Sequence, residues 1–280
     1  MKCKYVFFDI DHTLLSHVGT SHIPPETREA LRLLKANGHV PALATGRGAF
    51  LAHPIARDLG IELLVCADGA HILNGGRTLH RTCLPAAATD GLRSLAALRP
   101  EEVAAMDDCF IYTDNESEEW RTYFEAQAGY ACVRPLREMD RAFLGCLMVR
   151  PPLRGDYGPF TTPPAGVLLE ALHDFVEMRA AGVSKWNGIE RVMEHFRADA
   201  SDVITFGDGL NDVEMLRRAS IGMAVARASR AARDAASFVA DSNRCLTPSF
   251  GRAAMTSRPR SRVGALDPMP AVLGGKGALA

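Results

Sequence analysis

A regular alternation of short apolar runs and helical stretches at the start of the chain constrains the fold more than any other feature. The runs Lys4–Phe8, Val40–Ala44 and Ile61–Cys66 are typical of buried strands. The segments between them are expected to be helical, and the second of these, Gly48–Leu59, is expected to kink or break at Pro54. Because parallel neighbours in a sheet need crossover connections, this order predicts a parallel sheet wound with helices.

The pattern changes after Ala67, where we expect first a hairpin and then, from about Thr82, an inserted α+β domain. His71–Leu73 and Thr78–His80 flank Asn74-Gly75-Gly76, a sequence typical of a hairpin turn. The elements expected next are a helix around Thr89–Leu98, the strand Phe110–Thr113, a helix around Glu116–Ala128, the strands Cys146–Val149 and Phe175–Met178, and Leu168–Leu172 as either a strand or a helix.

The strand and helix rhythm then resumes. The expected elements are the amphipathic helix Lys185–Phe196, the strand Val203–Phe206, the helix Asn211–Arg218, the strand Ile221–Val225 and a helix around Ser229–Ala236. Together these patterns predict an α/β protein, in which a Rossmann-like parallel sheet core is interrupted by an inserted α+β domain.

We place the core at residues 1–81 and 180–250 and the inserted domain at 82–179. Residues 251–280 are rich in Gly, Pro and Arg and show no usable periodicity, which predicts a disordered tail. A basic tail that anchors the protein to a partner is the alternative.

Composition and charge exclude several classes of protein. Of the 280 residues, 47% are hydrophobic and 23% are charged, and the net charge is −1. We therefore expect no attraction to nucleic acid or to an anionic membrane. No apolar run approaches the ~20 residues that cross a bilayer, and the N-terminus does not resemble a signal peptide. The seven cysteines lack the spacing of a zinc or redox motif, which predicts reduced, mostly buried thiols in a cytoplasmic protein.

Two carboxylates, Asp9 and Asp11, directly follow the first apolar run. Burying both at the end of a strand is costly because like charges repel in a low dielectric, and a bound cation would relieve that cost. Such a pair can also divide labour, with one carboxylate attacking a substrate and the other moving protons. The alternative is a strand that ends in solvated acids, with Thr13 starting a turn.

The segment Gly207–Asp212 follows another apolar run and opens a helix. Its glycines permit a tight turn and a close approach of the backbone to a ligand. Carboxylates at such a turn, here Asp208 and Asp212, suit magnesium. Alternatively, Asn211 or Asp212 caps the helix that follows.

Thr45 and Gly46 come directly after the second apolar run, where a hydroxyl, backbone amides and a nearby helix start suit a phosphate. Lys185 begins a predicted helix and, taken alone, is typical of a solvated surface lysine. Because Asp9, Thr45 and Asp208 each follow a predicted parallel strand, we expect them to gather at the carboxyl edge of the sheet, where open α/β sheets bind ligands. The carboxylates would repel a phosphate dianion unless a divalent cation and Lys185 offset their charge.

At these segments the chain resembles the haloacid dehalogenase superfamily of phosphohydrolases. The four motifs of that superfamily appear in its order as Asp9-Ile10-Asp11-His12-Thr13, Ala44-Thr45-Gly46-Arg47, Lys185 and Gly207-Asp208-Gly209-Leu210-Asn211-Asp212. The insertion between the second and third motifs resembles a type-2 cap of the Cof-like subfamily, which Gly182-Val183-Ser184-Lys185 also resembles. The resemblance covers roughly residues 1–240.

The resemblance implies a magnesium-dependent phosphatase that hydrolyses a small phosphorylated metabolite, such as a sugar phosphate. Asp9 would attack phosphorus and become an aspartyl-phosphate. Asp11 would protonate the leaving oxygen and then activate the water that hydrolyses this intermediate. Thr45, the Gly46 amide and Lys185 would hold the phosphoryl oxygens. The cap would cover the site and read the substrate.

The resemblance also implies the metal ligands. Magnesium would be bound by Asp9, by Asp208 and by the backbone carbonyl of Asp11. Asp212 would support the metal shell, and Asn211 would help to position the phosphoryl group.

The expected partner is a small phosphorylated metabolite, with no nucleic acid and no membrane, and the protein is expected to be a monomer or a homodimer.

Several positions depart from the family pattern. His12 stands where glycine is usual, Asp68 and Arg227 stand where asparagine is common, and the family's usual ending is not visible after Asn243.

Two other functions stay open. The first is a phosphosugar mutase, because a related branch with this type of cap performs that reaction. The second is a non-catalytic binding module that kept the scaffold.

Overall fold

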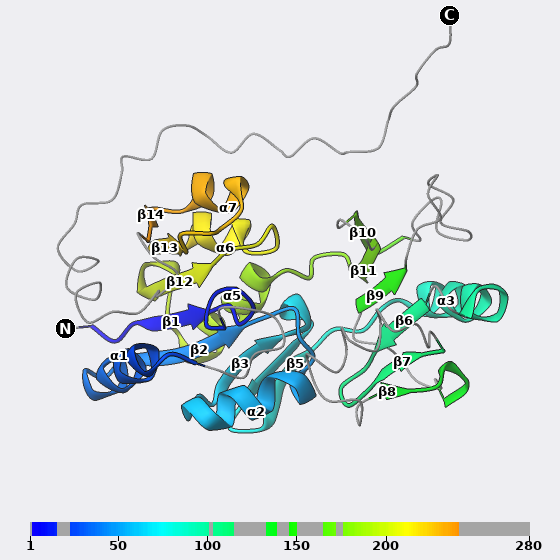
Figure 1. Ribbon diagram of the computed structural model, residues 1–280, viewed down its shortest axis with the longest axis horizontal. Coiled ribbons are helices and arrows are strands. Elements are labelled where there is room, and N and C mark those ends of the chain that lie inside the picture. Colours follow the sequence, from blue (N-terminus) through cyan, green and yellow to red (C-terminus); the bar gives the residue numbers. More distant parts are fainter. Residues whose placement is uncertain are drawn as a thin grey trace, which may run out of the picture.

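The computed structural model describes residues 2–15, 23–100, 103–114, 133–138, 146–149, 165–171 and 176–240. These residues form two β-sheets that lie beside each other along the long axis of the molecule (Figure 1). The mainly parallel larger sheet and the separate mixed sheet confirm the predicted fold class. The expected helix around Glu116–Ala128 and the expected tail at 251–280 lie outside the described residues.

The larger sheet has the strand order β14-β13-β12-β1-β2-β3-β4-β5. Its strands are β1 (Tyr5–Phe8), β2 (Val40–Ala44), β3 (Leu63–Cys66), β4 (His71–Asn74), β5 (Arg77–Arg81), β12 (Val203–Gly207), β13 (Ile221–Ala224) and β14 (Phe238–Val239). Neighbouring strands pair in parallel except that β4 is antiparallel to both β3 and β5, and β4 and β5 form the predicted hairpin. Because β1–β3 extend the sheet in one direction and β12–β14 in the other, the strand order reverses between β1 and β12. Open α/β sheets bind ligands at such a point.

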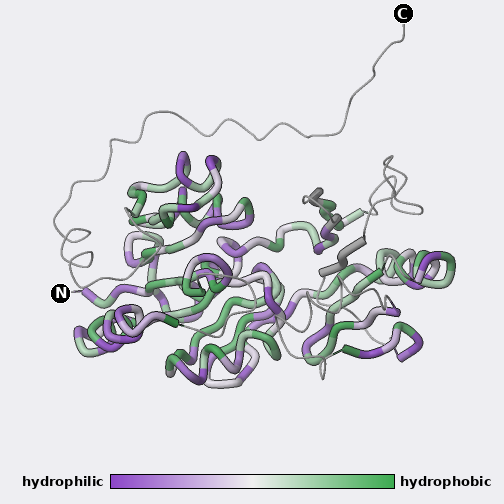
Figure 2. Tube along the Cα trace, viewed as in Figure 1, coloured by the Kyte–Doolittle hydropathy of each residue, from purple (hydrophilic) through white to green (hydrophobic). Residues whose placement is uncertain are grey.

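Side chains of the central strands alternate between two cores, one on each face of the larger sheet. Its helices are α1 (Pro25–Ala36), α2 (Ala49–Leu59), α5 (Lys185–Phe196), α6 (Val213–Arg218) and α7 (Arg230–Ala235). Val6 and Phe8 pack with residues of α1 and α2, whereas Phe7 packs with residues of α5. The strands accordingly run through the apolar, green part of the trace in Figure 2. Helix α2 continues through Pro54, so the expected break does not occur there, because burial of Ala52 and Ala56 on either side outweighs one lost backbone hydrogen bond.

The smaller sheet has the strand order β10-β11-β9-β6-β7-β8. Its strands are β6 (Val103–Met106), β7 (Ile111–Thr113), β8 (Val133–Arg134), β9 (Cys146–Val149), β10 (Val167–Ala171) and β11 (Val176–Ala180). Helix α3 (Ala86–Leu98) packs on one face, against Val103, Ala105 and Met178. The run Leu168–Leu172, for which the sequence left two options, is therefore mostly a strand, β10.

An apolar cluster joins the two sheets. Leu51 of α2 and Ala70, which follows β3, pack there with Ala104 and Met106 of β6 and with Ile111 of β7. The smaller sheet therefore has α3 on one face and packs against the core with its other face.

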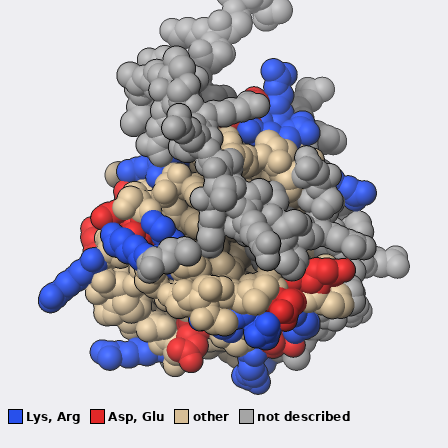
Figure 3. Space-filling view, turned by 90° about the vertical axis from the view of Figure 1, so that its left-hand side faces the viewer, with Lys and Arg blue, Asp and Glu red and all other residues tan. Residues whose placement is uncertain are grey.

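The surface gives two further findings. Among the described residues, no helix combines the length and apolar character that a membrane crossing needs. On the face drawn in Figure 3, Lys and Arg side chains are interspersed with Asp and Glu.

Of the four cysteines whose side chains are described, only Cys66 is buried, while Cys3 and Cys109 are exposed and Cys83 is intermediate. The expectation of mostly buried thiols is wrong for these four, because Cys3 precedes the first strand and Cys109 lies in the turn between β6 and β7.

Candidate active site

Four adjacent strands of the larger sheet end in polar residues at the same edge. Asp208, Asp9, Thr45 and Asp68 come after β12, β1, β2 and β3 respectively. The backbone N–H of Asp9 donates to the carbonyl of Phe206 at 3.0 Å, and that of Thr45 donates to a carbonyl of β3 at 2.9 Å. Because these bonds continue the sheet pairing past the strand ends, they hold the polar side chains in register with one another.

Lys185 connects two of the acidic residues at this edge. Its Nζ donates to Oδ1 of Asp9 at 2.6 Å and to Oδ1 of Asp212 at 2.7 Å. Lys185 is only 1% exposed, which excludes the alternative of a solvated surface lysine. Burial by itself would lower the pKa of Lys185, but attraction to Asp212, Asp9 and Asp68 outweighs it, and the pKa lies above its usual value. The lysine therefore stays charged.

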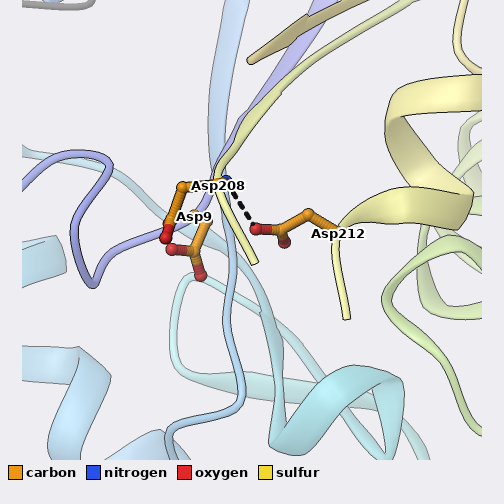
Figure 4. A group of neighbouring side chains, drawn as sticks. All are labelled: Asp9, Asp208 and Asp212. Carbon is orange, nitrogen blue, oxygen red and sulfur yellow. Dashed lines mark hydrogen bonds between the residues drawn. The ribbon is translucent and has the colours of Figure 1, made fainter. Parts of the chain in front are cut away.

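Asp9, Asp208 and Asp212 form an acidic cluster, in which each offers a carboxylate oxygen within 4.8 Å of the others (Figure 4). Burial raises the pKa of Asp9 well above its usual value, Lys185 opposes the shift, and the nearby Asp212 and Asp208 add to it. The pKa of Asp208 is also raised, mainly by burial and secondly by repulsion from Asp212. A cation bound to the cluster would lower the cost of keeping these groups ionised, and oxygen ligands of this kind fit a hard divalent cation.

The carboxylate of Asp212 closes the loop after β12. Its Oδ2 accepts hydrogen bonds from the backbone N–H groups of Asp208 at 2.8 Å and Gly209 at 2.9 Å (Figure 4). Asp212 stands at the N-cap position of α6, but neither its side chain nor that of Asn211 caps this helix, so the capping alternative is wrong. A Cβ on Gly207 would lie 2.5 Å from Cγ of Asp212, so only glycine leaves room for this arrangement.

Asp11 lies apart from the acidic cluster. Arg47 donates to both of its carboxylate oxygens, from Nε at 2.8 Å and from Nη2 at 2.6 Å. The backbone turns directly after it, because His12 has a φ of 58°. This left-handed conformation favours glycine, so His12, which stands where the family usually has glycine, occupies a strained position. The role of Arg47 was missed in the sequence because nothing in the chain marks it as the partner of Asp11.

The loop after β2 faces Asn211 and Asp68. The hydroxyl of Thr45 accepts a hydrogen bond from the N–H of Arg47 at 3.1 Å. Asn211 Nδ2 donates to Oδ1 of Asp68 at 3.0 Å, and a Cβ on Gly46 would lie 3.2 Å from Oδ2 of Asp68. Asp68 is thus part of the site, although the sequence marked it only as a departure from the family pattern. Its position after a third parallel strand was the available signal.

Two glycines bring the start of α5 against the turn that follows β3. A Cβ on Gly69 would lie 2.2 Å from the carbonyl oxygen of Ser184, and one on Gly188 would lie 2.5 Å from Cγ1 of Val65. The hydroxyl of Ser184 accepts the N–H of Asn187 at 3.1 Å and caps the helix. This close approach places Lys185 between Asp9 and Asp212.

The comparisons with known proteins agree with this geometry. A model of the haloacid dehalogenase-like hydrolase family matches residues 6–135 and 166–245. A proposed phosphatase of Bacillus subtilis, YkrA, is 28% identical over 242 residues, which cover 85% of this chain and 92% of YkrA. Phosphoglycolate phosphatase of Pyrobaculum aerophilum is 28% identical over 244 residues, which cover 86% of this chain and 90% of that enzyme.

A solved structure has the same fold. The crystal structure of a hypothetical protein from Geobacillus kaustophilus superposes with a TM-score of 0.73 at 28% identity, and the match covers 85% of this chain and 93% of that one. The family match spans most of the chain and contains all four motif segments. The chain therefore belongs to the haloacid dehalogenase-like hydrolases, among which it is similar to phosphatases.

Proposed function

We propose that this phosphatase, which acts on small phosphorylated metabolites, works through a covalent intermediate on Asp9 with magnesium as its cofactor, and that its substrate is a sugar phosphate. The observation that carries the proposal is the contact of Lys185 with both Asp9 and Asp212, beside Asp208, at the point where the strand order reverses. A buried lysine between carboxylates provides a cation for a phosphoryl group without exposing the nucleophile to bulk water.

The charges of the site favour a divalent cation. The five carboxylates described above outnumber the three cationic side chains beside them by two charges. The carboxylates belong to Asp9, Asp11, Asp68, Asp208 and Asp212, and the cations to Lys185, Arg47 and Arg179. One divalent ion would balance the excess before a phosphate dianion enters. We propose Asp9, Asp208 and the carbonyl of Asp11 as ligands of this ion, with Asp212 in support.

In the proposed first step, a carboxylate oxygen of Asp9 attacks phosphorus while the bond from phosphorus to the leaving oxygen breaks. Asp11, in its protonated form, gives a proton to that oxygen. In the second step Asp11 takes a proton from water, which attacks phosphorus and releases Asp9 and inorganic phosphate. Bound magnesium would supply charge neutralisation on the phosphoryl oxygens.

The chain's other groups would bind the phosphoryl oxygens. We assign this role to the hydroxyl of Thr45, the amide of Gly46, the side-chain amide of Asn211 and the ammonium group of Lys185. Asn211 and Gly46 both lie beside Asp68, and Lys185 lies beside Asp9, which supports this assignment. Fixed donors of this kind stabilise the transferring phosphoryl group.

We also propose residues 82–179 as the cap and residues 1–81 and 180–250 as the catalytic core. Residues 45–48, between β2 and α2, are named the phosphate loop here. Contact between Met106 and this loop supports the division, because a Cβ on Gly48 would lie 2.9 Å from Sδ of Met106. A cap in this position would exclude bulk water from the intermediate.

The test is a phosphatase screen over a panel of metabolites and an aryl phosphate, with and without magnesium. We expect magnesium-dependent phosphate release that Asp9→Asn abolishes and that the surface variant Asp58→Asn leaves intact. An isomeric sugar phosphate in place of free phosphate would instead identify a mutase. A complete lack of turnover would contradict the proposal and favour the non-catalytic alternative.

A further inference from the structure

One charged pair links the smaller sheet to the catalytic edge of the core. Nη1 of Arg179, in β11, lies 3.8 Å from Oδ2 of Asp68, in the turn after β3. Their side chains are only 9% and 4% exposed. Burying two charges costs several kcal/mol in desolvation, so such a pair is weak evidence for stability and points to a role in specifying geometry.

Asp68 is fixed against the groups that would hold the phosphoryl oxygens. Its backbone N–H donates to the carbonyl of Thr45 at 3.0 Å, and its Oδ1 accepts from Asn211 at 3.0 Å. Its backbone is left-handed, with φ 50° and ψ 31°, a conformation that Asp and Asn tolerate better than most residues. Asn would satisfy the same backbone and the same contact to Asn211. The carboxylate adds a negative charge, which attracts Arg179 and also Lys185.

Arg179 extends from the cap toward the core. Met178 packs with α3 on one face of the smaller sheet, so Glu177 and Arg179 lie on the opposite face. That face also carries Ala104 and Met106, which pack against the core. The separation of 3.8 Å is too long for a hydrogen bond, so Arg179 and Asp68 interact through charge attraction.

We propose that the pair of Asp68 and Arg179 positions β11 of the cap over the phosphate loop, which makes Arg179 a positioning residue for substrates that the cap reads. The inference rests on the proposed function, because the pair contacts the core at the phosphate loop, which binds the substrate only if that function holds. A substrate that fills the space under the cap depends on this geometry. A small aryl phosphate depends chiefly on the core.

The test compares Asp68→Asn, Arg179→Gln and the double variant with the wild-type protein in the presence of magnesium. For the best metabolite of the screen we expect each single variant to raise KM about tenfold, the size of one charged contact. For the aryl phosphate we expect Arg179→Gln to change kcat less than about twofold, because Arg179 belongs to the proposed cap and not to the core. The double variant should raise KM by little more than either single variant, because the two side chains act as one unit. Multiplicative effects, or an unchanged KM for the metabolite, would overturn the proposal.

Arg81→Gln is the matched control. Arg81 lies 3.2 Å from Asp108 in the turn between β6 and β7, so this pair also joins the core to the smaller sheet, but from β5 and not from the turn that carries Asp68. We expect its KM values to stay at the wild-type level. A rise equal to that of Arg179→Gln would show that any lost contact between core and cap has the same effect, and would overturn the assignment.

Amide hydrogen exchange provides a readout that needs no activity. We expect faster exchange at Val176–Ala180 in Asp68→Asn and Arg179→Gln, and wild-type exchange there in Arg81→Gln. Unchanged exchange in the first two variants would overturn the proposal even if the protein hydrolysed nothing. Failure of the proposed function would appear separately, as a wild-type protein that turns over neither substrate.

Discussion

Arg47 donates to both carboxylate oxygens of Asp11, at 2.8 and 2.6 Å, and so keeps that carboxylate outside the cluster of Asp9, Asp208 and Asp212. The two acidic residues of the first motif therefore occupy different environments. Asp9 is buried against Lys185, whereas the Asp11 side chain is 26% exposed and held by a fixed guanidinium. Different environments allow two neighbouring carboxylates to take different chemical roles.

The first prediction follows from the separation of Asp9 and Asp11. Asp11→Asn should lower steady-state kcat about 10²–10⁴-fold, because the side chain can no longer transfer protons. With p-nitrophenyl phosphate, whose leaving group needs no proton, the variant should still release about one equivalent of nitrophenol in a rapid burst. Stopped-flow absorbance measures the burst. Its absence, together with a changed magnesium requirement, would show that Asp11 serves the metal instead.

The second prediction concerns the acidic cluster. Magnesium should raise the melting temperature of the wild-type protein, and stabilisation should reach about 2.7 kcal/mol at a hundred times Kd. Asp208→Asn should lose most of this shift, because it removes an oxygen ligand from the cluster, while Asp58→Asn should retain it. Thermal melts across a magnesium titration, reversed with EDTA, measure the effect. An equal shift in Asp208→Asn would place the ion elsewhere.

The third prediction concerns Lys185. Lys185→Met should abolish turnover and lower the free energy of unfolding by about 3–5 kcal/mol in EDTA, because two buried carboxylates lose their partner. Adding Asp212→Asn to this variant should restore part of the loss, since one of the two buried charges is then gone. Urea denaturation in EDTA measures the free energy of unfolding of the single and the double variant. The exposed Lys2→Met should remain close to the wild type, and a Lys185→Met variant of wild-type stability would contradict the buried ion pair.

Much of the fold was visible in the sequence because the core strands are short, mostly apolar runs. The edge shared by Asp9, Thr45 and Asp208 follows from those runs, and the helix Lys185–Phe196 was predicted at its observed bounds. Strand β6 was missed because its sequence, Val-Ala-Ala-Met, fits a buried helix as well as a strand.

The contacts within the site were harder to predict. The partners of Asp11 and Asp68 come from other segments of the chain, Arg47 and Arg179, so no local pattern announces them. The departure at His12 was recognised, but its left-handed φ depends on the path of the loop after β1. Long-range pairing of this kind is decided by tertiary packing.

The fourth prediction concerns the approach of α5 to the turn after β3. In Gly188→Ala the new Cβ would lie 2.5 Å from Cγ1 of Val65 and 2.9 Å from Cα of Gly69. The helix must move away, which should cost about 1–3 kcal/mol of stability and lower kcat, because Lys185 begins the same helix. Glu194→Ala, at an exposed position of α5, is the control for the change in helix propensity. Wild-type kcat in Gly188→Ala would show that the position of Lys185 tolerates this shift.

The fifth prediction concerns stability at low pH. His71 is buried, with Nε2 at 2.9 Å from the hydroxyl of Thr78 and Nδ1 at 4.0 Å from a carboxylate oxygen of Asp108. Burial lowers the pKa of His71, attraction to Asp108 opposes the shift, and the positive charge of Arg81 adds to it. The unfolded chain, with a histidine pKa of about 6.5, therefore binds more protons than the folded protein below that pH.

The stability that the neutral His71 contributes is consequently present above about pH 6.5 and is lost as the pH falls below it. The free energy of unfolding in EDTA should drop between pH 7.5 and 5.5. His71→Gln should reduce that drop, because glutamine does not titrate and still reaches Thr78. Part of the drop should persist, since burial also lowers the pKa of His39 and His80. Urea denaturation at several pH values, with the exposed His195→Gln as control, measures the difference. If the free energy of unfolding of His71→Gln drops as much as that of the wild type, the folded protein does not lower the pKa of His71.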